Sequence, residues 1–154
     1  MIIRKALLTD AETIAKNNVT LALELENLIL EKEEAEKGSI AVLTGKRNGF
    51  YLVLEHNDEI IGQLFITEEW SDWRNKAIWW MHRVYVKKEY RKQGLFTKLL
   101  DELTKLAEEQ NVFALRLYVL NENENALSIY DHLNFHQTPF LILQHKKLDS
   151  LLSF

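Results

Sequence analysis

The stretch between Val84 and Thr97 joins an apolar, β-branched segment to a helical one through a short loop with one glycine, Gly94. A helix that begins at Gly94 would turn backbone N–H groups and the positive end of its dipole toward this loop. Such a junction suits the phosphates of a ligand. Five basic residues add positive charge to it: Lys87, Lys88, Arg91, Lys92 and Lys98. An ordinary strand-to-helix turn with solvated lysines is the alternative, and the residues alone leave both open.

Signatures of several other chemistries are absent from the sequence. The five glycines form neither a dinucleotide-binding fingerprint nor a Walker A loop, and no G-x-S-x-G elbow occurs. Without cysteine there is no disulfide, no Cys-ligated metal and no cysteine nucleophile. His132 and His136 are four residues apart, but the helix that would carry them should end near Leu133, so we expect no metal site. Dehydrogenases, P-loop enzymes, serine hydrolases and zinc proteases are therefore poorly supported.

The composition is that of a globular protein with one domain over residues 1–154. Apolar residues make up 47% of the chain and charged residues 27%. The net charge of -4 disfavours a nucleic-acid partner, since nucleic-acid-binding domains are usually basic. No apolar segment has the length of a membrane span, and the N-terminal residues do not resemble a signal peptide. We therefore expect a cytoplasmic protein with no membrane partner.

Hydrophobic periodicity predicts the elements that would position the basic loop, in the order β-α-α-β-β-β-α-β-α-β. Strands are expected over residues 2–8, 50–55, 60–68, 76–87, 112–120 and 140–147. Helices are expected over residues 10–37, 95–107 and 125–133, the first with room for a break near Asn27. That first helix should begin at a capping box between Thr9 and Glu12 and stop at Gly38, and residues 69–75 should form a loop. The three middle strands predict an antiparallel meander.

The strand that leads into the basic loop should place Trp80, His82, Val84 and Val86 on one face, because side chains alternate along a strand. Four tryptophans gather in the same region: Trp70, Trp73, Trp79 and Trp80. They form core and a loop anchor in one interpretation. In the other they line an acceptor pocket and attract a cationic amine through their ring faces.

Two blocks of the sequence resemble the GNAT superfamily of acyl-CoA N-acyltransferases. The six residues from Arg91 to Phe96 (RKQGLF) resemble its acetyl-CoA signature Q/R-x-x-G-x-G/A. The run from Asn123 to Phe135 (NENALSIYDHLNF) is similar to the family's N-x-x-A-x-x-x-Y-x-x-x-G-F. Phe96 departs from the usual Gly or Ala, and Asn134 replaces a Gly but tolerates a left-handed turn. The resemblance implies an α/β (α+β) fold with a mixed, mostly antiparallel sheet flanked by helices.

The resemblance also implies a reaction, which is transfer of an acetyl group from acetyl-CoA to a primary amine by direct attack. The absence of cysteine agrees with a mechanism that has no acyl-cysteine intermediate. The loop would hold the CoA pyrophosphate with Arg91, Lys92, Gln93, Gly94, Leu95, Phe96 and Thr97. The pantetheine arm would bind the main chain of Val84 and Val86 and the side chain of Asn123. The acceptor would be a small-molecule or peptide amine, and similar proteins are often homodimers; a CoA-binding sensor without turnover is the alternative.

Catalytic roles follow from the same resemblance. Tyr130 stands where the family places the tyrosine that protonates the leaving thiolate; otherwise it is a core residue. His82 stands nine residues before Arg91, where some arylalkylamine acetyltransferases place a catalytic histidine, so it is our candidate base. Glu68, Glu69 or no dedicated base are the rival interpretations. Trp80 occupies the position of the base glutamate in histone-type members, so that assignment fails here.

Overall fold

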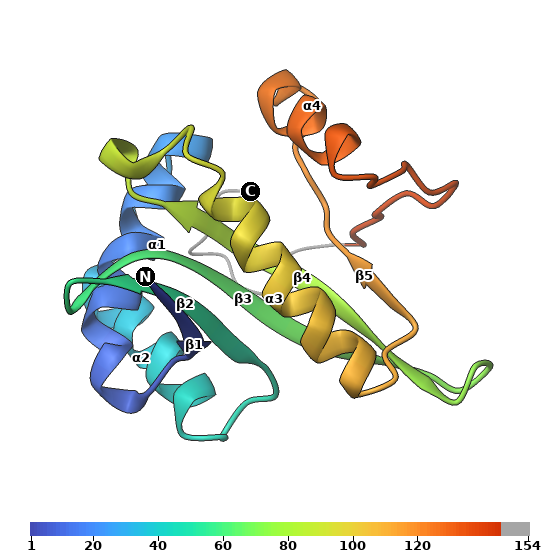
Figure 1. Cartoon of the computed structure of the whole chain (residues 1–154), viewed down its shortest axis with the longest axis horizontal. Coiled ribbons are helices and arrows are strands. Elements are labelled where there is room, and N and C mark those ends of the chain that lie inside the picture. The colour runs from blue at the N-terminus through green and yellow to red at the C-terminus, as the bar shows by residue number, and fades with distance from the viewer. Residues whose placement is uncertain (146–154) are drawn as a thin grey trace. The chain divides into compact units, whose positions relative to one another are not determined.

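Five strands form one sheet, in the order β1-β2-β3-β4-β5, in the computed structural model, which describes residues 1–145 (Figure 1). They are β1 (Ile2–Lys5), β2 (Phe50–His56), β3 (Glu59–Ser71), β4 (Lys76–Val86) and β5 (Ala114–Arg116). Neighbouring strands are antiparallel except for β4 and β5, which are parallel. The predicted fold class, a mixed and mostly antiparallel sheet with helices, is confirmed.

The chain divides into two compact units, residues 1–118 and 119–154, and each is described by itself. The first unit holds the whole sheet together with α1 (Ala11–Glu26), α2 (Lys32–Leu43) and α3 (Leu95–Glu109). The second unit holds α4 (Glu124–His132). A single domain over residues 1–154 therefore stays a prediction.

Helices cover both faces of the sheet (Figure 1). On one face, Ile14 of α1 forms a buried cluster with Tyr51 and Val53 of β2, and Val42 of α2 packs against it. On the other face α3 lies so close to Gly62 of β3 that an added Cβ there would be in contact with its Leu99. Burial of an aliphatic side chain contributes about 1.5–3 kcal/mol. These two apolar layers hold β3 and β4 in place, and both strands carry candidate site residues.

A buried polar contact also joins α1 to β3. The side-chain amide of Gln63, which is fully buried, accepts a hydrogen bond from Asn17 Nδ2 at 2.8 Å. Its Nε2 donates to Asn18 Oδ1 at 2.9 Å. Because an unpaired buried amide is costly, these bonds fix α1 against the middle of β3.

The first predicted helix is in fact two helices. Asn27 adopts a left-handed backbone, with φ of 50°, and ends α1, so the break near Asn27 is confirmed. Gly38 lies inside α2, so the predicted stop at this residue is wrong. The helix continues past it because Val42 and Leu43 pack against the buried cluster.

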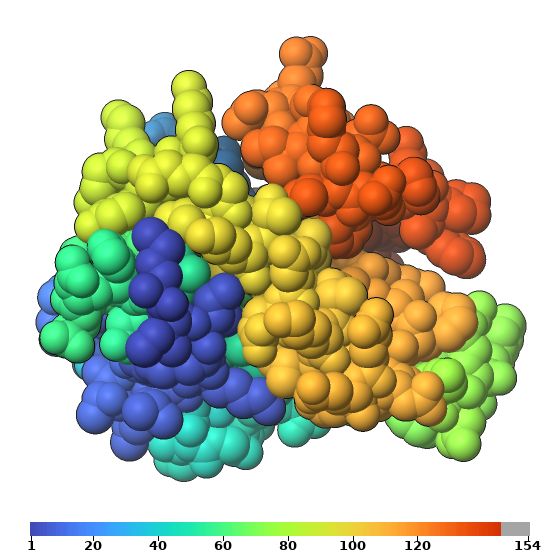
Figure 2. All heavy atoms as spheres, viewed as in Figure 1, coloured from blue at the N-terminus to red at the C-terminus, as the bar shows by residue number. Residues whose placement is uncertain are grey.

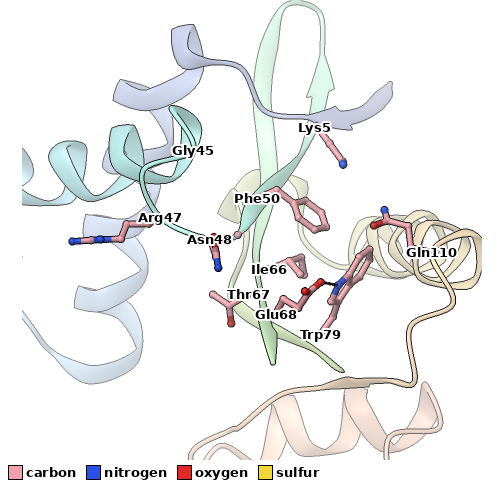
Figure 3. A pocket seen from close by; sticks show the side chains of 11 residues that line it. Lys5, Gly45, Arg47, Asn48, Phe50, Ile66, Thr67, Glu68, Trp79 and Gln110 are labelled. Carbon is pink, nitrogen blue, oxygen red and sulfur yellow. Dashed lines mark hydrogen bonds between the residues drawn. The ribbon is translucent and has the colours of Figure 1, made fainter. Parts of the chain in front are cut away.

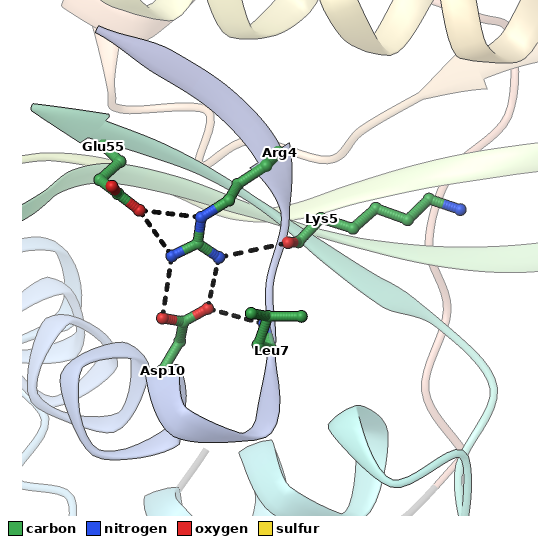
Figure 4. A network of polar contacts seen from close by, with 5 residues as sticks. All are labelled: Arg4, Lys5, Leu7, Asp10 and Glu55. Carbon is green, nitrogen blue, oxygen red and sulfur yellow. Dashed lines mark hydrogen bonds and ion pairs between the residues drawn. The ribbon is translucent and has the colours of Figure 1, made fainter. Parts of the chain in front are cut away.

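The predicted capping box at the start of α1 is also wrong, because an ionic network occupies the Asp10 carboxylate (Figure 4). Arg4 donates to both oxygens of Asp10, at 2.7 and 3.1 Å, and its Nε donates to Glu55 at 2.8 Å. The backbone N–H of Leu7 donates to Asp10 at 2.7 Å. Burial opposes the charge of Asp10, but the hydrogen bonds from Arg4 and Leu7 outweigh it and lower the pKa of this carboxyl. The network ties β1 and β2 to the turn that precedes α1.

Four strand predictions differ from the structure by three or more residues. β1 ends at Lys5 rather than at residue 8, because Leu8–Asp10 form a turn of 3-10 helix. β3 continues to Ser71 because it pairs with β4 as far as Lys76, so part of the predicted loop 69–75 is strand. This β3–β4 turn projects from the first unit, in light green in Figures 1 and 2. β5 covers only three residues of the predicted 112–120. Residues 140–145 form no strand, and the side chains from Phe140 to Leu143 are exposed; the rest of the predicted strand, residues 146 and 147, lies outside the described residues.

Candidate functional site

The loop between β4 and α3 has the geometry that the sequence predicts. Gly94 is the N-cap of α3, with φ of 70°, and the first backbone bond of the helix joins Lys98 N–H to Gly94 O at 3.2 Å. An added Cβ at Gly94 would meet no atom within 4 Å. Figure 2 shows this loop, in yellow-green, at the surface of the first unit. The N–H groups of the first helical turn thus begin beside open space, where an anion could approach.

The side chains of the loop differ in their surroundings. Lys92, Gln93 and Thr97 are exposed, whereas Leu95 is buried in the core and Phe96 is half-buried. Leu95 therefore anchors the start of the helix, and its contribution to a ligand site would come from its backbone. Phe96 takes the place that a Gly or Ala has in the resembled signature, with its ring partly out of solvent.

Arg91 is engaged with the protein itself. Its Nη2 pairs with Glu24 of α1 at 2.6 Å, and its Nε donates to the backbone oxygen of Val86 at 2.8 Å. The guanidinium also lies 5.7 Å from the centre of the Tyr85 ring. Arg91 thus holds the loop against α1 and the end of β4, and its charge is paired with that of Glu24.

β4 pairs with β5 along only part of its length. The two strands pair only between Ile78 and Trp80 on β4 and between Ala114 and Arg116 on β5. From Met81 to Val86, β4 pairs with β3 alone among the strands of the described chain. Val84 and Val86 therefore lie in a segment whose β5 side has no strand partner, as a backbone-binding role for a ligand requires.

A β-bulge interrupts β4 at Arg83, whose φ is 52°. Pairing with β3 shifts by one residue, from Phe65 opposite His82 to Gln63 opposite Tyr85. One extra residue reverses the alternation of side chains beyond it.

The predicted common face for four β4 side chains is therefore wrong. Trp80 and His82 lie on the face that α1 and α2 cover, whereas Val84 and Val86 lie on the opposite face. His82 nevertheless lies two residues beyond Trp80, which is the last residue of β4 that pairs with β5.

His82 has a partner at each ring nitrogen. Its Nε2 lies 2.8 Å from Thr67 Oγ1 on β3, and its Nδ1 lies 3.3 Å from the hydroxyl of Tyr118, just beyond β5. Its ring lies 5.6 Å from Phe65 and 5.5 Å from Tyr118. Burial, and then the charge of Arg83, lower the pKa of His82. The imidazole is therefore neutral at pH 7 and has one nitrogen able to accept a proton.

Thr67 and Tyr118 are residues that the sequence reasoning missed. Thr67 pairs with Trp80 across β3 and β4, and Arg116 pairs with Trp80 across β4 and β5. Both partners of His82 follow from these registers, which locate residue 118 two positions beyond the β4–β5 ladder. No local pattern in the sequence reports the register of two strands separated by a helix.

The two rival carboxylates hydrogen-bond to tryptophans. Glu68 accepts from Trp79 Nε1 at 3.2 Å, and Glu69 accepts from Trp80 Nε1 at 2.6 Å. Glu69 also lies 3.9 Å from Arg116. Both carboxylates are therefore already engaged by N–H donors of the protein.

The four tryptophans have different environments. Trp79 is buried, and Trp80 is half-buried with the Arg116 guanidinium 5.8 Å from its ring centre. Trp70 and Trp73 are exposed, the latter by 90%. They therefore do not form one pocket lining, and the core interpretation fits Trp79.

A cavity of about 370 Å³ lies at the end of the sheet where β2 begins (Figure 3). Phe50 and Trp79 form part of its wall, and Lys5 and Glu68 bring opposite charges to it. Thr67 lines the same cavity and contacts His82 with its hydroxyl. One residue that lines the cavity thus also contacts the candidate base.

The second unit carries the other two candidate residues. Asn123 caps α4, with its Oδ1 accepting from Ala126 N–H at 3.1 Å, and its amide nitrogen donates to no other residue among those that the structure describes. Burial raises the pKa of Tyr130, whose ring lies 5.6 Å from Phe135. Asn134 has φ of 62°, so the left-handed turn predicted for it is confirmed.

Within residues 1–145, no group of three or more His, Cys, Asp or Glu side chains could hold a metal ion. None of the helices in the same range is long and apolar enough to cross a membrane.

Comparisons with known proteins agree with this architecture. The model of the acetyltransferase (GNAT) family matches residues 21–135, well over half of the chain. A crystal structure of a possible acetyltransferase from Clostridium difficile 630 is 37% identical, with a TM-score of 0.90 over 96% of this chain and 98% of that one. A predicted acetyltransferase with acetyl-CoA from Clostridium acetobutylicum shares the fold at 20% identity, with a TM-score of 0.76 over 93% and 95% of the two chains.

A curated relative is the thialysine N-ε-acetyltransferase of Bos taurus, which is 31% identical over 71 residues. This match spans 46% of this chain and 41% of the bovine protein.

Proposed function

Since this chain belongs to the acetyltransferase (GNAT) family, we propose that it transfers an acetyl group from acetyl-CoA to a primary amine by direct attack. The observation that carries the proposal is the open helix start at Gly94 beside a stretch of β4 without a β5 partner. A linear cofactor with a pyrophosphate and an amide-rich arm suits such a pair of features. The Clostridium acetobutylicum neighbour is described with acetyl-CoA, and the bovine relative is named as an N-acetyltransferase, which supports the same reaction.

In the proposed complex the pyrophosphate binds at the beginning of α3. Backbone N–H groups from Gly94 to Thr97 donate to its oxygens, and Lys92 and Gln93 contribute exposed polar groups. Arg91 keeps the loop in place through Glu24. The backbones of Val84 and Val86 and the amide of Asn123 bind the pantetheine arm.

His82 takes the role of base in this proposal. A primary amine is mostly protonated at neutral pH and must lose a proton before it attacks the acetyl carbon. The neutral imidazole of His82 can take this proton. His82 also lies close to the proposed cofactor, because it follows the last β4 residue that pairs with β5. The freed lone pair then forms the new amide bond as the bond from carbon to the CoA sulfur breaks.

Tyr130 donates the proton that the leaving sulfur needs. Its phenol is neutral at pH 7, since burial raises its pKa above the ordinary value of about 10. The nitrogen of the new amide then releases its second amine proton to solvent, a proton from solvent restores the Tyr130 phenol, and the turnover yields CoA thiol and the acetylated amine.

Thiol release from acetyl-CoA over a library of primary amines tests the proposal. We expect thiol to appear only when enzyme, acetyl-CoA and a suitable amine are all present. Thiol release that does not depend on the amine, or its complete absence over a broad library, would contradict the proposed reaction.

A further inference from the structure

His82 is enclosed between two oxygen atoms of very different exposure. Thr67, on the Nε2 side, belongs to the half-buried interior of the sheet. Tyr118, on the Nδ1 side, is 55% exposed. The ring of His82 also lies near the rings of Phe65 and Tyr118. Tyr118 is therefore the more accessible of the two hydrogen-bond partners of His82.

We propose that Tyr118 relays the proton of the acceptor amine to Nδ1 of His82, an inference that rests on the proposed acetyl transfer. The ammonium form of the amine gives one proton to the Tyr118 oxygen, while the Tyr118 hydroxyl proton passes to Nδ1. Tyr118 ends as a neutral phenol and His82 as an imidazolium. The amine keeps its electron pair for attack on the acetyl carbon, and the imidazolium returns its extra proton to solvent after the product has formed.

The relay requires one assignment of the two ring nitrogens. In it, Nε2–H donates to Thr67 Oγ1 over the shorter contact of 2.8 Å, which sets the tautomer and the ring orientation. Nδ1 then holds the lone pair and accepts from the Tyr118 hydroxyl over the looser contact of 3.3 Å. The ring of Tyr118 also lies 6.3 Å from the ring of Trp80, at an interplanar angle of 48°.

Tyr118→Phe deletes the hydroxyl and keeps the ring contacts with His82 and Trp80. Because proton transfer by a positioned group contributes roughly 10²–10⁴-fold, kcat should fall at least about 100-fold. The KM for acetyl-CoA should stay near its wild-type value. Tyr51→Phe is the matched control, because it removes a hydroxyl from a ring stacked on Phe65, on the same face of the sheet, without touching His82; its kcat should equal that of the wild type.

A double-mutant cycle separates a relay from a structural contact. If Tyr118 acts through His82, adding Tyr118→Phe to His82→Gln should lower kcat no further. Losses that multiply would show that the two residues act independently and would overturn the relay. A kcat of Tyr118→Phe equal to that of the wild type would overturn it as well.

Nitrogen-15 NMR of the histidine rings provides a readout that needs no substrate. In the wild type at neutral pH, the His82 shifts should show a protonated Nε2 and an unprotonated Nδ1, and Thr67→Val should weaken this preference. A protonated Nδ1 in the wild type would leave no acceptor for Tyr118 and would overturn the relay. If the wild type turns over no amine, the proposed function is overturned, and the relay with it. If the wild type turns over normally and Tyr118→Phe has the same kcat, the relay alone is overturned.

Discussion

Replacing Gly94 by valine should weaken acetyl-CoA binding while leaving the protein folded. The backbone at Gly94 has φ of 70°, and the position of its missing Cβ is open space. Valine would therefore meet no protein atom, but its side chain would occupy the space in front of the first turn of α3. This is where the proposed pyrophosphate must approach the backbone.

The cost in stability follows from the backbone conformation alone. A residue with a Cβ in the left-handed region costs roughly 1–2 kcal/mol relative to glycine. For a chain of this length the corresponding decrease in Tm is about 2–8 °C. The side chain should weaken acetyl-CoA binding at least about tenfold, equivalent to about 1.4 kcal/mol or more.

Gly45 offers a matched control in the same chain. Its φ is 74°, and its missing Cβ also has no neighbour within 4 Å, but it lies between α2 and β2. Gly45→Val and Gly94→Val should therefore lose similar stability in thermal unfolding. Only Gly94→Val should lose affinity in calorimetric titration with acetyl-CoA, performed at a temperature where both variants are folded. Equal acetyl-CoA affinities of the two variants would refute the assignment of the pyrophosphate to this loop.

Three further predictions concern single side chains. Tyr130→Phe should keep acetyl-CoA affinity and lower kcat by roughly 10²–10⁴-fold, less so with a donor whose thiol leaves more easily; an unchanged kcat would make Tyr130 a packing residue. His82→Gln should lower kcat/KM at neutral pH and abolish an acidic limb that lies below about pH 6.5 in the wild type; His56→Gln, in β2, is the control. Asp10 has a lowered pKa in the folded protein, so its contribution to stability is present above about pH 4 and is lost on acidification. In denaturant unfolding, the free energy of unfolding of Asp10→Asn should therefore fall less than that of the wild type between about pH 5 and pH 3.

Local signals in the sequence predict much of this fold correctly. The change of period at Gly94 predicts the start of α3, and the left-handed backbone of Asn27 and Asn134 agrees with the tolerance of asparagine for that conformation. These features depend on residues that are close together in the chain. The same is true of the hairpin between β2 and β3, whose polar turn residues separate two apolar runs.

The features that the sequence does not predict depend on long-range contacts. Nothing about Arg83 marks it as the bulge of β4, since a bulge is set by how two strands fit one another. The partnership of His82 with Tyr118 requires the parallel register of β4 and β5, which α3 separates in the chain. Asp10 has the residue type of a helix cap, but the nearby guanidinium of Arg4 binds its carboxylate instead.

Transfer of a labelled acetyl group tests the central claim most directly. The enzyme is incubated with acetyl-CoA labelled in its acetyl group and with a library of primary amines, and label is then measured on small molecules and on the protein. Direct attack predicts that label appears on an amine at the rate of CoA thiol release, with none retained on the protein. Label held by the protein would contradict direct attack, and tight binding of acetyl-CoA without transfer to any amine would identify a CoA-binding module without catalysis.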